Sequence, residues 1–302
     1  MTRGPSELRV PDADLDELRS RLRRTRWPEP WPPQDAGSGW EAGTDSGELR
    51  RLVTYWADEY DWRLQEAAIN ALPGQVASPD GTDVFYLRFD PEVPGALPIV
   101  LTHGWPSSFL ELVPLARRLS APSRHGGQPA DAFTVIVPAL PGYPLSPQQP
   151  ALPPAPTHEL WHRLMHDELG FARYAAHGGD LGAGVTSRLG QAHPEAVAGI
   201  HLLAVADPAG YDPATVTPAE REYLDAVAAW YADGGGYAHE QRTRPRTLSF
   251  GLSDSPAGLL AWIVEKYREW SDCDGDLSRR FSDDFVLTQA SLYWFANAIS
   301  MV

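Results

Sequence analysis

Three things are scarce in this sequence: cysteine, long apolar runs and positive charge. Its 302 residues contain one cysteine, Cys273, which excludes an intramolecular disulfide. No stretch reaches the ~20 apolar residues that a membrane-spanning helix needs. The opening MTRGPSELRV also lacks the apolar segment of a secretory signal. These absences predict a cytoplasmic protein without a membrane anchor.

The charge balance is acidic. Aspartate and glutamate number 40 against 25 lysines and arginines, which gives a formal net charge of -15 at pH 7. A surface of this sign repels phosphate-rich partners, so we expect no nucleic acid partner. Small neutral molecules remain as the substrates or ligands to consider.

The first part of the chain has the periodicity of amphipathic helices. Leu15, Leu18 and Leu22 recur at helical spacing. A second helix is expected to place five apolar side chains on one face: Leu49, Leu52, Val53, Trp56 and Tyr60. The N-terminal region is therefore predicted to be a helical meander.

From Asp83 onward the period changes to that of strands. Five short apolar runs are expected to be strands, namely residues 84–89, 98–102, 133–137, 173–177 and 199–203. Helical stretches lie between the later runs, which predicts an α/β fold with a mainly parallel sheet. Because these runs are almost continuously apolar, we expect both faces of the sheet to be buried.

Two further segments interrupt or follow the strands. Residues 147–157 are rich in proline and are expected to form a surface loop. Residues from about 206 to 270 return to helical periodicity, with a glycine turn at 234–236. This pattern is typical of a helical cap inserted into an α/β core.

Two short motifs each follow an expected strand: HGWP at residues 103–106 and GGDLG at residues 178–182. The second has the form of a nucleophile elbow, a sharp turn from strand to helix that needs small residues two positions before and after its centre. Gly178 and Gly182 meet that need around Asp180. The alternative is an ordinary turn with an aspartate N-cap, but the HGWP motif favours catalysis.

An aspartate at the centre of the elbow predicts a particular chemistry. Its carboxylate is already ionised and can attack a saturated carbon, such as that of an epoxide, to form an alkyl ester. The backbone N–H of Leu181, at the start of a helix, would face the oxyanion that forms when water attacks this ester. The N–H of Trp105 is the natural second donor.

Together these motifs resemble those of the microsomal-type epoxide hydrolases, which have the α/β-hydrolase fold. The resemblance covers nearly the whole chain. It includes LDELRSRLRRTRWPEP near the N-terminus, LVTYWADEYDWR at 52–63, PALPGYPLS at 138–146, HGGDLGAGVTSRL at 177–189, the segment GYAHEQRTRPRTLSFGLSDSPAGLLAWIVEKY, and SLYWF at 291–295.

The resemblance implies Asp180 as the nucleophile, the amides of Trp105 and Leu181 as the oxyanion hole, and Tyr237 as one acid for the epoxide oxygen. It implies a small apolar epoxide and water as substrates, and no cofactor. It also implies structural roles for the remaining motif residues: His103, Gly104, Pro106, Gly178, Gly179 and Gly182. The expected division is a meander at 1–80, an α/β-hydrolase core at 81–205, a helical cap at 206–280 and the start of the return to the core at 281–302.

The chain departs from the resembled family in two ways. Vertebrate members carry a membrane anchor, and family members continue through a second tyrosine, an acid and a water-activating histidine, all expected beyond Val302. The last histidine here is His239. An inactive fragment or pseudoenzyme that binds apolar ligands is therefore the alternative. Haloalkane dehalogenases share the aspartate elbow, but Leu181 stands where they usually place a tryptophan.

A third hypothesis comes from HELWH at residues 158–162, which matches the HExxH pattern of zinc hydrolases. Two histidines one helical turn apart can hold zinc, with Glu159 as the base. However, Leu160 and Leu164 lie on the apolar stripe of the same helix, and the usual third-ligand patterns are absent. We therefore interpret the histidines as a polar helix face.

Overall fold

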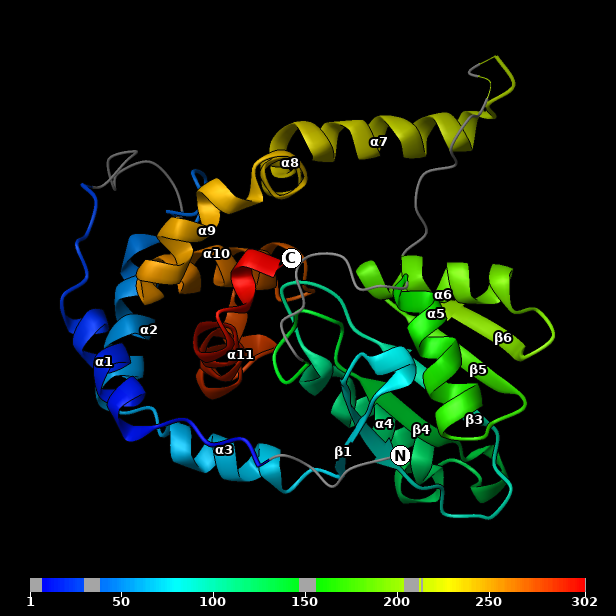
Figure 1. Ribbon diagram of the computed structural model, residues 1–302. Helices are drawn as coiled ribbons and strands as arrows, with labels where there is room; N and C mark the ends of the chain where they lie inside the picture. Colours follow the sequence, from blue (N-terminus) through cyan, green and yellow to red (C-terminus); the bar gives the residue numbers. More distant parts are fainter. Residues whose placement is uncertain (1–6, 30–38, 147–155, 204–211, 213, 302) are drawn as a thin grey trace.

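The protein is described by a computed structural model that covers residues 7–29, 39–146, 156–203, 212 and 214–301. Within these residues six strands form one sheet in the order β1-β2-β4-β3-β5-β6 (Figure 1). The strands are β1 (Gly74–Ala77), β2 (Val84–Phe89), β3 (Pro98–Thr102), β4 (Thr134–Pro138), β5 (Tyr174–Gly178) and β6 (Val197–Leu202).

The four strands β4, β3, β5 and β6 run parallel, whereas β1 and β2 pair antiparallel at one end of the sheet. This arrangement confirms the predicted α/β fold with a mainly parallel sheet. All five expected strands are present within two residues of their predicted bounds, and β1 was missed. β1 is short, and a glycine begins it, so it carries little alternating pattern.

The expectation that both faces of the sheet are buried is wrong for β6. Most of its residues are exposed, including Ile200 at 46%. Among the described strands β6 has a neighbour on one side only, and helix α6 packs against it. An apolar run in sequence therefore did not indicate burial at this edge of the sheet.

Helices surround the sheet and build a second layer beside it (Figure 1). They are α1 (Asp12–Arg23), α2 (Ser46–Asp58), α3 (Trp62–Asn70), α4 (Val113–Ser120), α5 (Thr157–His162), α6 (Leu181–Ala192), α7 (Pro218–Gly234), α8 (Gly236–Thr243), α9 (Pro245–Asp254), α10 (Pro256–Glu269) and α11 (Asp283–Ala296). Helices α1 and α2 confirm the two amphipathic patterns. Helix α3 was not predicted.

The N-terminal and C-terminal helices pack together. Helix α1 contacts α2 and α10, while α11 contacts α2, α3 and α10. Trp56 is fully buried here, and its indole N–H donates to the hydroxyl of Ser291 at 3.1 Å. One continuous apolar core joins this helical layer to the sheet. The segment after β3 also contacts the helical layer, because the hydroxyl of Tyr293 in α11 donates to the carbonyl of Ser107 at 2.8 Å.

Helices α7 to α10 confirm the predicted helical character of the segment after β6, and α7 ends at Gly234 where a glycine turn was expected. Most of the expected proline-rich loop, residues 147–155, lies outside the described residues. The division into domains stays a prediction. In the part of the chain that the structure describes, no helix is both long and apolar enough to cross a membrane.

Candidate active site

Asp180 occupies the sharp turn between β5 and α6, as the elbow pattern predicts. Its backbone has φ 50° and ψ -125°, a region that residues other than glycine rarely adopt. Holding an aspartate there costs about 1–3 kcal/mol, and such strain is typical of functional sites. The residue is exposed, so the turn presents its carboxylate outward from the sheet.

Glycines on both sides allow this turn to form. A Cβ on Gly178 would lie 2.0 Å from the carbonyl oxygen of Gly182, and a Cβ on Gly182 would lie 2.2 Å from that of Thr102. Real Cβ atoms do not approach a backbone oxygen this closely. Strand β5, the start of α6 and the end of β3 therefore meet at a spacing that only glycine permits.

The HGWP loop reaches the same carboxylate from β3. The backbone N–H of Trp105 donates a hydrogen bond of 2.9 Å to Oδ1 of Asp180. A Cβ on Gly104 would lie 2.4 Å from the same side chain, so this glycine lets the loop approach. Pro106 follows through a cis peptide bond. The structure thus brings the two predicted motifs into direct contact.

The second predicted donor is the amide of Leu181, the first residue of α6. Backbone N–H groups in the first turn of a helix have no partner within the helix, and they carry the positive end of its dipole. The Trp105 amide bonds to the Asp180 carboxylate, and the Leu181 amide follows Asp180 directly in the chain. A negatively charged oxygen at this position would be stabilised by both.

His103 supports the loop and is not in a position to ionise easily. It is buried, its Nδ1 donates to the carbonyl of Gly104 at 3.1 Å, and its Nε2 accepts from the N–H of Leu140 at 3.1 Å. Burial lowers the pKa of His103 to about 4. The imidazole is therefore neutral at pH 7, and it ties the HGWP loop to the segment after β4.

Tyr237, predicted as an acid, lies in α8 with its ring stacked on that of Trp105. The ring centroids are 5.4 Å apart and the planes differ by 8°. Burial raises the pKa of the Tyr237 phenol, and the negative charge of Asp180 raises it further. The phenol therefore stays protonated at neutral pH and can donate a hydrogen bond.

Comparison with known proteins places this geometry in a family. Residues 4–112 match the model of the epoxide hydrolase N terminus, and residues 98–291 match that of the alpha/beta hydrolase fold. The chain is 40% identical over 296 residues to a putative epoxide hydrolase of Stigmatella aurantiaca, covering 97% of this chain and 66% of that protein. It is 31% identical to the juvenile hormone epoxide hydrolase of Bombyx mori, covering 98% and 68%.

A solved structure gives the same result. The epoxide hydrolase of Aspergillus niger superposes with a TM-score of 0.82 at 31% identity, covering 98% of this chain and 76% of that one. The chain belongs to the epoxide hydrolase family. It spans about two thirds of the length of the curated relatives it matches.

Two charged residues of this chain lie beside the site and were missed by the sequence reasoning. Lys266, in α10, is the only lysine of the chain and is buried at 5% exposure. Its Nζ bonds to Glu265 at 2.8 Å and lies 4.9 Å from the ring centroid of Tyr237. Glu111 follows the HGWP motif in a short helical turn. The sequence signal that could have identified Lys266 was a lone lysine on the apolar stripe of a helix.

Within the described residues, the HELWH motif does not bring the ligands of a metal site together. Helix α5 ends at His162, and the π-helical turn Arg163–Glu168 follows, so the ring of His162 stacks on that of His193 at 3.6 Å. Glu159 pairs with His193 instead of facing a metal. Among the described residues no group of three histidine, cysteine or acidic side chains could hold a metal ion.

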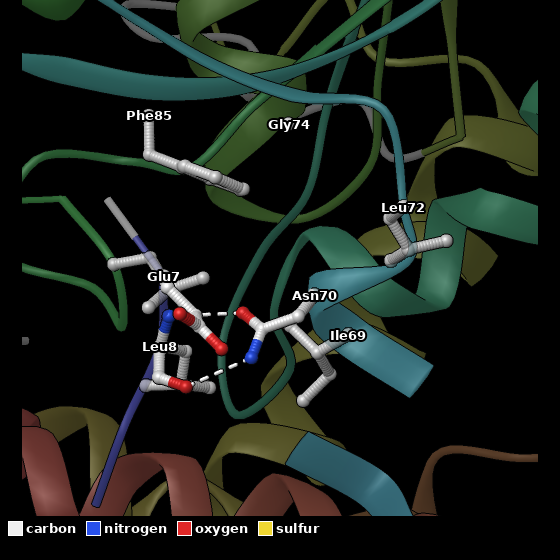
Figure 2. A pocket seen from close by; sticks show the side chains of 8 residues that line it. Glu7, Leu8, Ile69, Asn70, Leu72, Gly74 and Phe85 are labelled. Carbon is white, nitrogen blue, oxygen red and sulfur yellow. Dashed lines mark hydrogen bonds between the residues drawn. The ribbon is translucent and has the colours of Figure 1, made fainter. Parts of the chain in front are cut away.

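A cavity of about 210 Å³ lies between the N-terminal segment, α3 and β2. Figure 2 shows how Asn70 fixes its edge: its side chain accepts from the N–H of Leu8 at 2.9 Å and donates to the Leu8 carbonyl at 2.8 Å. None of its lining residues touches Asp180 or Trp105 in a recorded contact. It therefore belongs to the docking of the N-terminal segment and not to the active site.

Proposed function

We propose that this chain carries out the chemistry of an epoxide hydrolase, converting a small apolar epoxide to a vicinal diol through an ester on Asp180. The observation that carries the proposal is the hydrogen bond between the Trp105 amide and Asp180 within a glycine-dependent elbow. Family membership supports it, and so do the names of the relatives. A cytoplasmic location, expected from the sequence, remains part of the proposal.

The first step is alkylation. One oxygen of the Asp180 carboxylate attacks an epoxide carbon, a C–O ester bond forms, and the ring C–O bond breaks with its electron pair moving to the epoxide oxygen. The Tyr237 phenol hydrogen-bonds to that oxygen and donates a proton to the alkoxide. Its stacking on Trp105 fixes the phenol beside the nucleophile.

The second step is hydrolysis of the ester. Water attacks the carboxyl carbon of Asp180, and negative charge moves to the former carbonyl oxygen. The amides of Trp105 and Leu181 are the donors for this charge, because both belong to backbone segments that are already fixed. The bond from the carboxyl carbon to the alkyl oxygen then breaks, and the alkyl oxygen takes one proton of the attacking water and leaves as the diol. The other proton returns to the Tyr237 phenolate by way of solvent, and the Asp180 carboxylate is restored.

The aromatic walls indicate the substrate class. The ring of Trp105 has Tyr237 on one side, at 5.4 Å, and the rings of Trp262 and Trp270 at 6.5 and 5.9 Å. Such a surface gains free energy from contact with an apolar group but offers few polar partners. We therefore propose an epoxide with an apolar or aromatic substituent.

The test is intact-protein mass spectrometry of the 302-residue chain after incubation with styrene oxide. We expect an increase equal to one substrate molecule in the wild type and none in Asp180→Asn, because an amide is a poor nucleophile. Asp225→Asn, on the exposed surface of α7, is the matched control and should react like the wild type. An adduct that persists in Asp180→Asn would show labelling elsewhere and contradict the proposal.

The acid is tested separately. Tyr237→Phe should slow adduct formation by about 100-fold, the usual contribution of a positioned general acid. Tyr223→Phe, an exposed tyrosine of α7, should leave the rate unchanged. Equal rates in the two variants would remove Tyr237 from the mechanism while leaving Asp180 in place.

A further inference from the structure

Lys266 is an unusual side chain for its surroundings. It is the one lysine of the sequence, and in α10 it is only 5% exposed. A buried ammonium group loses its hydration, which is costly unless other groups replace the lost water. An apolar side chain of similar length would fill the same space without that cost. The charge at this position therefore calls for an explanation beyond packing.

Two kinds of group replace the water around this ammonium. Its Nζ donates a hydrogen bond of 2.8 Å to the carboxylate of Glu265. Nζ also lies 4.9 Å from the ring centroid of Tyr237, 5.6 Å from that of Trp262 and 5.7 Å from that of Trp270. The face of an aromatic ring carries partial negative charge and attracts a cation. The ammonium of Lys266 is therefore held against aromatic rings.

The same three rings contact Trp105 in the HGWP loop. Their centroids lie 5.4, 6.5 and 5.9 Å from that of Trp105, in the order Tyr237, Trp262 and Trp270. The backbone N–H of Trp105 in turn bonds to the carboxylate of Asp180. One aromatic layer thus lies between the buried ammonium and the nucleophile, and the proposed acid belongs to that layer.

The Tyr237 phenol lies among groups that oppose the loss of its proton. Burial raises the pKa of Tyr237, and the charges of Asp180 and of an ionised Tyr231 raise it further. A cation within about 4–6 Å has the opposite effect, because it favours the charged form of an acid. The negative charge of a phenolate is delocalised into its ring, so the distance from Nζ to the ring centroid is the relevant one. At 4.9 Å, Lys266 lies within this range.

We propose that Lys266 is a positioning residue for the acid of the reaction, holding the ring of Tyr237 and stabilising the phenolate that remains when its proton leaves. The proposal rests on the epoxide-opening step at Asp180 proposed above. In that step the carboxylate forms the C–O ester bond, the ring C–O bond breaks toward the epoxide oxygen, and the phenol proton moves to that oxygen. Lys266 keeps its protons throughout and takes no covalent part.

Glu265 fixes the ammonium without cancelling its effect on the rings. The side chain of Glu265 is 26% exposed, whereas that of Lys266 is 6% exposed. Solvent therefore screens the field of the carboxylate more strongly than that of the ammonium. The positive charge dominates at the buried rings.

The contact can be tested without any substrate. A fluorinated tyrosine at position 237 is more acidic than tyrosine, so its phenol titrates while Lys266 is still protonated, and fluorine NMR of the whole chain follows the titration. Lys266→Met should raise the pKa of this phenol by about 1, because the nearby positive charge is gone. Arg242→Gln removes an exposed positive charge from α8, the helix that carries Tyr237, and should leave the pKa unchanged. An unchanged pKa in Lys266→Met, or an equal rise in Arg242→Gln, would overturn the proposal, whether or not any epoxide reacts.

A further variant separates charge from packing. Methionine has nearly the length of lysine, and replacing a buried charge by an apolar group often leaves stability unchanged, so Lys266→Met should keep a melting temperature near that of the wild type. Lys266→Arg keeps the positive charge and can stack on the rings, so its phenol pKa should stay close to the wild-type value. A rise in Lys266→Arg as large as that in Lys266→Met would mean that packing, and not charge, acts on Tyr237, which contradicts the proposal.

The effect on the reaction is tested with styrene oxide, by following adduct formation with mass spectrometry. Lys266→Met should slow this step by about 3- to 10-fold, because an acid that holds its proton more strongly transfers it more slowly. In Tyr237→Phe the same substitution should have no further effect, since no phenolate forms there. Equal slowing in both backgrounds would show that Lys266 acts through another group and would refute the proposal. If the wild type forms no adduct, the function proposed for Asp180 fails, while the phenol titration still decides whether Lys266 acts on Tyr237.

Discussion

The elbow at Asp180 and the helix that carries HELWH look equally functional in sequence, yet their structures differ in kind. The elbow holds an aspartate at positive φ, depends on glycines at backbone contact distance, and adjoins polar atoms without partners. The helix has ordinary backbone angles at its cap residues. Its His162 bonds to Tyr174 and stacks on His193, and His193 in turn pairs with Glu159.

This difference separates a functional motif from a coincidental one. Strain and unsatisfied polar groups cost free energy, so a fold retains them where they serve a purpose. Stacked and hydrogen-bonded rings carry no such cost. The comparison can be tested by substituting residues, changing the pH or adding zinc, and by measuring how the stability of the protein changes in each case.

The largest effect is expected from crowding the elbow. Gly182→Ala places a methyl group 2.2 Å from the backbone oxygen of Thr102, so β3 or α6 must move, and we expect a loss of about 3 kcal/mol or more in unfolding free energy. Gly184→Ala, two residues later in α6, meets nothing within 4 Å and should be neutral or slightly stabilising. Urea denaturation of both variants measures the contrast. Equal stabilities would mean that the elbow is not tightly packed.

The next effect is acid sensitivity at His103. A histidine whose folded pKa is lowered contributes stability above its unfolded pKa of 6.5, and this contribution is lost as pH falls toward its folded pKa of about 4. Because the folded pKa is the lower of the two, we expect the free energy of unfolding to fall by about 2 kcal/mol between pH 7 and pH 5. The difference in unfolding free energy between wild type and His103→Asn should shrink by that amount over the same range. A constant difference would show that His103 does not titrate there.

The helix that carries HELWH should also lose stability at acid pH, but by less than the His103 region. Burial lowers the pKa of His162, and so do its neighbours His193 and His166. Stability should therefore fall as pH drops below 6.5, but by less than about 1 kcal/mol because the rings are partly exposed. His162→Gln should remove this small loss. A larger acid effect from His162 than from His103 would reverse the comparison.

The smallest expected effect is that of zinc. Since Glu159 is engaged by His193 and no metal-binding group exists among the described residues, added zinc should not raise the melting temperature. Differential scanning fluorimetry with wild type and His158→Ala measures this. A rise in the wild type that disappears in the variant would show that the motif binds metal after all.

The sequence predicted those parts of the fold that depend on local periodicity or on steric requirements. Strands β2 to β6 and helices α1 and α2 have clear periods, and Gly178 and Gly182 identify the elbow because few other turns need glycines at that spacing. The contact between HGWP and Asp180 also followed, since the ends of adjacent parallel strands meet.

Features that depend on distant packing were not predictable. Glu111 looks like any surface acid until the fold places it opposite α10 and near Asp180. Lys266 lies near the rings of Tyr237, Trp262 and Trp270, and this arrangement exists only after α8 has packed beside α10.

The single buried lysine has a practical consequence for handling this protein. Reagents that modify primary amines will reach Lys266 only when α10 moves away from the rings of Tyr237, Trp262 and Trp270. The extent of modification at Lys266 therefore reports, over time, how often α10 moves away from these rings.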